Sequence, residues 1–242
     1  MSNYLVFFCA KVGFKKWFLP VVFENKCYTY PRKIKEKSED MAAKKYLTTL
    51  NTRSFLYEET KQVASLLHEG KRHDEIAEII WEKNLFQLTS EDRANRFYSE
   101  IQKRLEELDI YLFNQFLATD IPTSKAILFY ALLKKDQLFY EWMREVVWVK
   151  FLVLDWQISR EETEAFFELK AMQNKTVASW TPETKSLLID SYHRVLHEVD
   201  MANVVDDVLQ LQRLAINEDI RTYLIERKEI EIVEVMLGEL IG

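Results

Sequence analysis

Two histidines are the residues whose type and spacing best suit chemistry. His193 and His197 lie four positions apart and would share one face of a helix, where two imidazoles can hold a zinc ion. The metalloprotease motif also needs a glutamate directly after the first histidine, and this chain has Arg194 there. Because no third ligand is evident, we predict surface or partly packed histidines and no bound metal.

Other catalytic patterns are missing from the sequence. His68 and His73 flank Gly70 and fit polar residues at helix ends. The chain has no G-x-S-x-G, Walker A or G-x-G-x-x-G motif, and its 4 glycines leave little scope for a phosphate-binding loop. Its carboxylates recur at helical spacing, as they do on solvated faces. We therefore predict a protein that is not an enzyme and has no cofactor.

Basic side chains between residues 71 and 104 are better candidates, for binding rather than catalysis. A helix expected after residue 90 has two stripes: an apolar one with Phe97, Ile101, Leu105 and Leu108, and an opposite one with Arg93, Arg96, Glu100 and Lys103. Cations on one stripe can meet phosphates or guanine edges while the other stripe packs. Asn95 and Ser99 could add polar contacts. The predicted DNA-binding residues are Lys71, Arg72, Arg93, Arg96, Lys103 and Arg104.

The two preceding helices are spaced like the start of a trihelical DNA-binding unit. An apolar run ends at Gly70, a charged turn comes next, and a second helix begins around Asp74. Two features oppose DNA recognition. The turn before the third helix is longer than usual, and Glu91, Asp92 and Glu100 would lie near phosphates. On pattern alone, a plain three-helix packing unit competes with DNA recognition and is favoured.

Helical periodicity continues beyond this unit, and capping signals mark several helix starts. Thr89 with Asp92 resembles a capping box for the third helix. Ser159 with Glu162 forms another box, and Thr181-Pro182 is a strong start signal. The further helices expected are 109–118, 124–135, 137–155, 159–173, 181–199, 206–215 and 218–227.

The composition favours long helices. The 242 residues include only 4 Gly and 4 Pro, with 48% hydrophobic and 30% charged residues, which is a globular balance. We predict an all-α fold of two packed lobes, 41–120 and 121–242, that divide at the break 120–123. The first lobe would hold the helix-turn-helix-like unit. Over 229–235 acidic and apolar residues alternate, so a short β-wing or strand competes with a last helix there.

Charge is spread unevenly along the chain, whose net charge is −6. Residues 1–40 carry 8 basic and 4 acidic residues, residues 41–104 carry 11 and 10, and residues 105–242 carry 14 and 25. An acidic C-terminal half will not bind nucleic acid by bulk charge, so a DNA-binding patch must lie nearer the N-terminus. Only Cys9 and Cys27 occur, without a C-x-x-C motif, and no apolar run reaches 18 residues, so we expect a cytoplasmic protein without a membrane span.

Residues 1–40 differ from the rest of the chain. They hold two short apolar runs and a basic stretch at 31–37. A signal peptide is one interpretation, but the early apolar run is short, lacks a basic flank and has no A-x-A-like cleavage site. We predict instead an N-terminal extension, either disordered or upstream of a true start at Met41.

Three blocks of residues resemble one known family. The first block spans 49–108 and includes Phe55, Glu59, Leu66-Leu67, Gly70, Glu75-Ile76, Asn84, Gln87, Ser90, Arg93, Ile101 and Arg104-Leu105. The second spans 125–150 and includes Tyr130, Leu133, Asp136, Leu138-Phe139, Trp142-Met143 and Glu145-Val146-Val147. The third comprises Trp180-Thr181, Thr184 and Leu196. Together they resemble the BrxA family of BREX bacteriophage-exclusion systems.

The resemblance implies a helical accessory protein of a phage-defence operon, without a catalytic centre, that associates with double-stranded DNA and other BREX proteins. The family has also been labelled an inner-membrane protein, which this sequence does not support. Our hypothesis is that the first lobe binds duplex DNA and the acidic second lobe contacts protein partners, with no membrane and no small-molecule substrate. The alternative is a helical protein–protein adaptor with no nucleic-acid role.

Overall fold

The computed structural model describes residues 21–23, 26–28, 45–206 and 208–241. The chain divides into two units, Met1–Ala42 and Ala43–Gly242. In the first unit, strands β1 (Val21–Phe23) and β2 (Lys26–Tyr28) pair antiparallel, with Val22 opposite Cys27. The rest of the predicted N-terminal extension lies outside the described residues.

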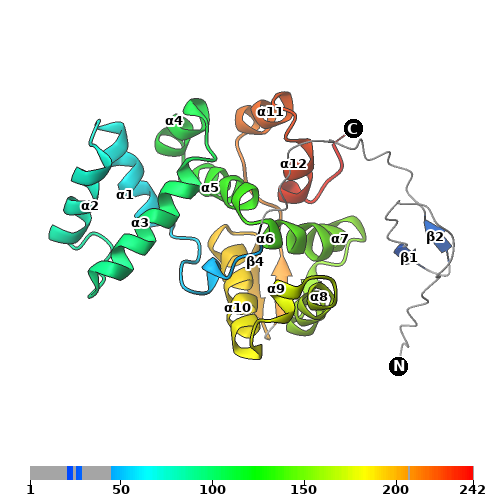
Figure 1. Ribbon diagram of the computed structural model, residues 1–242. Helices are drawn as coiled ribbons and strands as arrows, with labels where there is room; N and C mark the ends of the chain where they lie inside the picture. The colour runs from blue at the N-terminus through cyan, green and yellow to red at the C-terminus, as the bar shows by residue number, and fades with distance from the viewer. Residues whose placement is uncertain (1–20, 24–25, 29–44, 207, 242) are drawn as a thin grey trace. The chain divides into compact units, whose positions relative to one another are not determined.

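The second unit begins with a short 3-10 turn, η1 (Thr49–Asn51), and three helices that contact one another: α1 (Tyr57–His68), α2 (His73–Glu82) and α3 (Glu91–Leu105). Gly70 comes after α1 with a φ of 81°, a left-handed conformation that glycine adopts without steric cost. The amide of Lys71 then donates to the carbonyl of Leu66, which completes a Schellman-type ending. The predicted end of the first helix is therefore confirmed. Figure 1 shows the three helices grouped at one end of this unit.

The start of α3 differs from the prediction by one residue. Ser90, not Thr89, is the N-cap, and its hydroxyl accepts a hydrogen bond from the backbone N–H of Arg93. In the preceding loop Asn84 and Gln87 have positive φ, and the side chain of Asn84 accepts from the N–H of Leu88. The loop from 83 to 90 is ordered by these local bonds, and it is longer than a helix-turn-helix turn, as the sequence indicated.

A central helix pair supports this unit. Helix α4 (Ile110–Ala118) is capped by Asp109, and α5 (Ile121–Lys135) is capped by Asp120. Helix α5 therefore begins three residues before the predicted start at 124, and residues 121–123 of the predicted break are helical. All side chains from 126 to 133 on α5 are buried. Helix α5 contacts α3 and α4 as well as α6 and α12, so it connects both parts of the chain. A division into two lobes near residue 120 stays a prediction.

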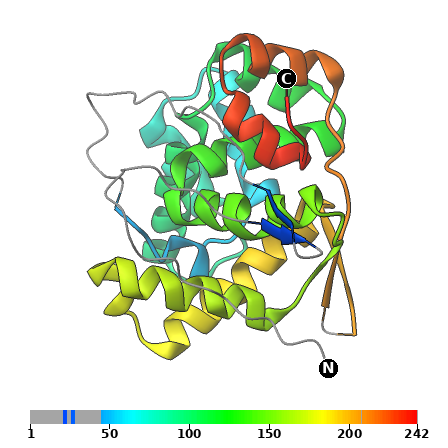
Figure 2. The same cartoon turned by 90° about the vertical axis from the view of Figure 1, so that its right-hand side faces the viewer.

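After α5 the chain is helical from α6 (Gln137–Trp142) through a π-helical segment η2 (Met143–Val147) to α7 (Trp148–Leu152). Helix α8 (Arg160–Gln173) starts at the predicted capping box of Ser159 and Glu162. A short helix α9 (Lys175–Ala178) is next, and α10 (Pro182–Glu198) starts at the predicted Thr181-Pro182 signal. Figure 2 shows the yellow helices α8 to α10 on one side of the green helices and α11 and α12 on the other.

The helix predicted at 206–215 is wrong. Strands β4 (Ala202–Val205) and β5 (Val208–Leu211) form a hairpin there, and β3 (Gln157–Ile158) pairs with β5, giving the order β3-β5-β4. Asp206 has a φ of 51°, a turn conformation that a helix cannot contain. Pairing with distant β3 and burial of Leu209 stabilise strands at this position.

The C-terminal segment is helical. Helix α11 (Glu218–Glu226) matches the predicted element, and α12 (Ile230–Leu237) covers the tail for which a strand competed with a helix. The predicted all-α class with a short β element near the C-terminus is confirmed, although that element lies at 202–211. Among the described residues, no helix combines the length and the apolar character that a bilayer crossing needs.

Candidate nucleic-acid interface

Helix α3 has two sharply different faces. Its inner face buries Ala94, Phe97, Tyr98, Ile101 and Leu105 against α1, α2 and α5. Its outer face exposes Asp92, Asn95, Arg96, Ser99 and Lys103, which recur at helical spacing. Figure 1 shows α3 beside α1, α2 and α5. Within the part of the chain that the structure describes, the side chains of the outer face are exposed and accessible to a ligand.

Arg104 belongs to the inner face, so its prediction as a DNA contact is wrong. Its side chain is 0% exposed, and it donates hydrogen bonds to the backbone carbonyls of residues 53, 54 and 55. Its Nε also lies 3.0 Å from Oε1 of Glu100. The bonds to the three carbonyls fix α3 against the segment that precedes α1, and the burial of the guanidinium leaves Arg104 no path to a phosphate.

Glu100 is also an inner residue rather than part of the outer stripe. It is 4% exposed and accepts from both Arg104 and Lys135, whose Nζ lies 2.8 Å from Glu100 Oε1. Two cations thus neutralise this carboxylate within the fold. One of the three acidic residues that opposed DNA recognition is therefore removed from the interface, and only Glu91 and Asp92 remain exposed beside it.

The outer side chains of α3 differ in whether they form hydrogen bonds or ion pairs within the protein. Asn95, Ser99 and Lys103 make no side-chain hydrogen bond or ion pair with any residue that the structure describes. Arg96 is 59% exposed, and its guanidinium lies 2.8 Å from Oδ2 of Asp92, one turn earlier. Arg93 is exposed at the flank, 5.5 Å above the ring of Phe97. Most of this face thus keeps its hydrogen-bonding capacity for an external partner.

Lys71 and Arg72 lie in the turn between α1 and α2, and this turn is tied to α3. His73, the first residue of α2, has its Nδ1 2.9 Å from the hydroxyl of Tyr98 and 2.9 Å from the side-chain amide of Gln102. The turn is thereby held beside the C-terminal half of α3, where Lys103 lies. Arg72 is 72% exposed and pairs with Asp74, at 2.9 Å, an ion pair that is weak at such exposure.

The link between this turn and α3 was not visible in the sequence. Tyr98 and Gln102 are four residues apart on α3, a spacing that places both on one helix face, but their partner His73 is more than twenty residues earlier in the chain. Lys71, Arg72, Arg93, Arg96 and Lys103 are all exposed, and they lie on α3 and on the turn before α2. Whether they contact DNA stays a prediction.

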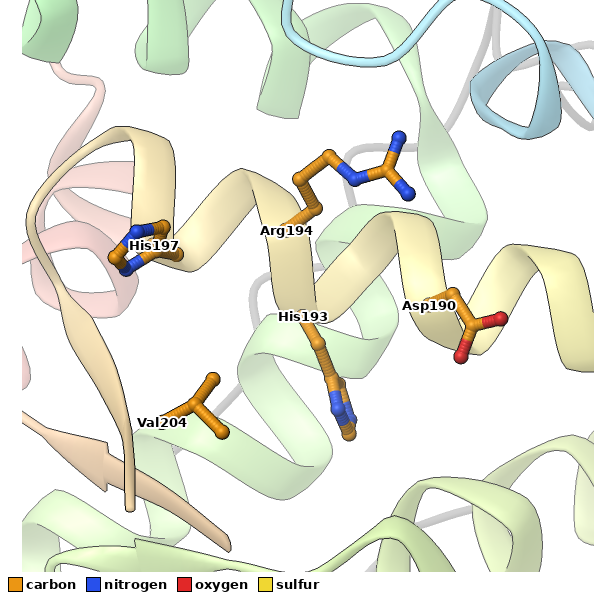
Figure 3. Close-up of a pocket in the computed structure, with 5 residues that line it drawn as sticks. All are labelled: Asp190, His193, Arg194, His197 and Val204. Carbon is orange, nitrogen blue, oxygen red and sulfur yellow. The ribbon is translucent and has the colours of Figure 1, made fainter. Parts of the chain in front are cut away.

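The histidine pair on α10 borders an open hollow of about 280 Å³, lined also by Asp190, Arg194 and Val204 (Figure 3). Nε2 of His193 lies 2.9 Å from the hydroxyl of Thr163, and His197 lies 3.2 Å from the carbonyl of Ala202. Both imidazoles thus have partners within the fold. The described residues contain no group of three or more His, Cys, Asp or Glu side chains placed to hold a metal ion.

Burial determines the protonation of His193. Desolvation, aided by the positive charge of Arg160, lowers the pKa of the His193 imidazole to about 4, whereas Asp190 acts in the opposite direction. Arg160 itself pairs with Asp190, at 2.5 Å. His193 is therefore neutral at physiological pH, and its contact with Thr163 joins α10 to α8 as a hydrogen bond between uncharged groups.

Comparison with known proteins identifies the family. The BrxA family model matches residues 44–228. The chain belongs to the BrxA family. It is 31% identical to BREX protein BrxA of Bacillus cereus (strain H3081.97), over 80% of this chain and 97% of that protein. It is 26% identical to BREX protein BrxA of Paramagnetospirillum magneticum (strain ATCC 700264 / AMB-1), over 78% of this chain and 94% of that protein.

A solved structure shares the fold. The crystal structure of an uncharacterized protein from Magnetospirillum magneticum has a TM-score of 0.69 and 22% sequence identity, over 80% of this chain and 99% of that one. The BrxA match includes the whole of α3 and the turn before α2, and it excludes the first unit of the chain. The candidate interface therefore lies in the part of the molecule that BrxA proteins have in common.

Proposed function

We propose that this BrxA-family protein is a cytoplasmic, non-catalytic component of a BREX phage-defence system that binds double-stranded DNA. The single observation that carries the proposal is the outer face of α3, on which Asn95, Ser99 and Lys103 are exposed without an intramolecular partner among the described residues, beside the exposed guanidinium of Arg96. The printed name of both relatives, BREX protein BrxA, supports membership of that system.

The dimensions of the interface suit duplex DNA. Helix α3 has 15 residues and is about 22 Å long at about 1.5 Å per residue, and the DNA major groove, about 12 Å wide, admits one helix. The helix exposes cations at both ends, Arg93 and Lys103, and the turn beside it adds Lys71 and Arg72. These cations can neutralise phosphates on both sides of the groove.

The acidic remainder of the chain supports a division of roles. Residues 105–242 carry 14 basic and 25 acidic residues, so they repel phosphate and favour contacts with other proteins. On α8 the apolar side chains of Leu169 and Met172 are 46% and 83% exposed, one helical turn apart. We propose that this part of the molecule contacts other BREX proteins. The same observation favours the second candidate function, a protein adaptor that does not bind DNA.

The test is duplex binding at about 50 mM salt, where phosphate contacts are strongest. Replacing Arg93, Arg96 and Lys103 by Glu should weaken binding on the order of 100-fold, with helicity by circular dichroism unchanged. A matched control replaces Lys175, Lys185 and Arg194 by Glu, because these three have no ion pair among the described residues and lie on α9 and α10.

The two triple variants carry the same net charge, so bulk electrostatics cannot explain a difference between them. Equal binding by both would show that the site is not on α3. Failure of the unmodified protein to shift any duplex at low salt would favour the protein adaptor.

A further inference from the structure

The outer face of α3 presents two uncharged polar side chains, Asn95 and Ser99, between two cations, Arg93 and Lys103. The ion pair of Asp92 and Arg96 lies on the same face. Neither Asn nor Ser is a good helix former in the interior of a helix. Neither side chain makes a hydrogen bond within the part of the chain that the structure describes. Their hydrogen-bonding groups are available to a ligand.

Asp92 adds a second indication about that ligand. Its carboxylate lies 2.8 Å from the Arg96 guanidinium and holds it across the outer face. A carboxylate at this position repels a phosphate, so it weakens any role of Arg96 as a phosphate contact. A guanine edge is uncharged and presents two acceptors, O6 and N7, to the N–H groups that Asp92 leaves free. The pair Asp92–Arg96 therefore suits a base edge better than a phosphate.

The axial spacing of these residues agrees with base recognition. Asn95 and Ser99 are about 6 Å apart along the helix axis at about 1.5 Å per residue, which matches roughly two base-pair steps of about 3.4 Å. Arg93 and Lys103 lie on either side of this pair, about 15 Å apart along the axis. The centre of α3 can thus face base edges while the long side chains of Arg93 and Lys103 extend toward the phosphates that border the groove.

We propose that α3 binds DNA sequence-specifically, with Arg96 contacting a guanine and Asn95 an adjacent adenine in the major groove. This inference rests on the proposed DNA-binding function and goes beyond it, because phosphate contacts alone carry no sequence information. Asp92 is a positioning residue for Arg96, and Ser99 adds one hydrogen bond to the next base. Arg93 and Lys103 bind phosphates whatever the sequence.

The experiment selects bound duplexes from a pool with a randomised central segment, using the full chain. We expect a short enriched motif that contains a guanine next to an adenine, bound on the order of 30-fold more tightly than a scrambled duplex. Asn95→Ala and Arg96→Lys should each remove the preference at one position while the affinity for scrambled DNA stays within about threefold. Asp92→Asn should relax the guanine position in the same way, although Arg96 itself is intact.

Lys103→Gln is the matched phosphate variant. It should weaken binding to the motif and to scrambled DNA equally, and it should lower the slope of log affinity against log salt by about 1. Duplex binding without an enriched motif, or variants at 92, 95 and 96 that keep the motif, would overturn the inference and leave the proposed function standing. No binding of any duplex would overturn both.

Discussion

Helices α3 and α10 are both long and amphipathic, yet polar side chains on their surfaces differ in whether they bond to other parts of the protein. On α10, Asp190 pairs with Arg160, His193 contacts Thr163, and His197 contacts a backbone carbonyl. On the outer face of α3, Asn95, Ser99 and Lys103 have no such partner among the described residues. These three side chains of α10 therefore join it to neighbouring parts of the fold, whereas these three side chains of α3 remain available, a difference that spacing along the chain does not show.

The largest expected effect is a loss of stability that distinguishes the inner face of α3 from its outer face. Arg104→Met should lower the free energy of unfolding by about 3–5 kcal/mol, because it leaves three backbone carbonyls and Glu100 without the buried guanidinium. Arg96→Met should change stability by less than about 0.5 kcal/mol, because its pair with Asp92 is exposed. Urea denaturation monitored by circular dichroism measures both. Similar losses in the two variants would contradict the assignment of Arg104 to the core.

The next effect concerns α10 and depends on pH. The folded protein holds the pKa of His193 at about 4, whereas an unfolded histidine titrates near 6.5, so the unfolded chain binds more protons between these values. Stability should therefore fall as the pH falls from 6.5 towards 4, by about 2 kcal/mol between pH 7.5 and pH 5 from this group. Stability curves at several pH values measure the slope.

His193→Gln should flatten that slope, since Gln does not titrate. If His193→Gln left the slope of stability against pH unchanged, other groups would cause the acid sensitivity. The buried histidine would then no longer distinguish α10 from α3.

A smaller loss of stability is expected when the N-cap residue of either helix is replaced. Ser90 caps α3 through a hydrogen bond of 3.4 Å, and Thr181 caps α10 through one of 3.1 Å with Pro182 next in the chain. Replacing either cap by Ala should cost about 1 kcal/mol, and the loss should be larger for Thr181 because its bond is shorter. Thermal denaturation of the two variants compares them, with Thr89→Ala as a control that should be nearly silent.

The smallest expected change in stability, on the outer face of α3, is the most informative about that face. Asn95→Ala and Ser99→Ala should leave stability unchanged or raise it by up to about 0.5 kcal/mol, since Ala is the better helix former and no contact is lost. Chemical denaturation with replicate curves can resolve this difference. A clear destabilisation would show that these side chains serve the fold, and the outer face of α3 would then resemble α10.

The features that could be predicted from the sequence are those that depend on neighbouring residues. Gly70, the Ser159–Glu162 box and the Thr181-Pro182 start act through bonds within about four residues, so their patterns are visible locally. The hairpin at 202–211 was missed because it depends on pairing with β3, more than forty residues earlier. A helical pattern cannot reveal such a partner.

Arg104 shows a different kind of error. It lies three residues after Ile101 and seven after Phe97, so helical periodicity alone places it on the apolar stripe. Its positive charge led to its inclusion among the DNA contacts. The carbonyls that accept its hydrogen bonds lie about fifty residues earlier, and no local signal marks them. Helical spacing correctly indicated that Arg104 is buried, whereas its charge led to the wrong prediction.

The bonds of Arg104 also set the orientation of α3. Each residue turns a helix by about 100°, so a slip of one residue would carry Asn95 and Arg96 from the open side to the flank. The carbonyls of three successive residues outside α3 hold Arg104, and Lys135 of α5 holds Glu100, so these bonds oppose rotation of α3 about its own axis. A residue that can never touch a ligand thereby determines which side chains are presented to one.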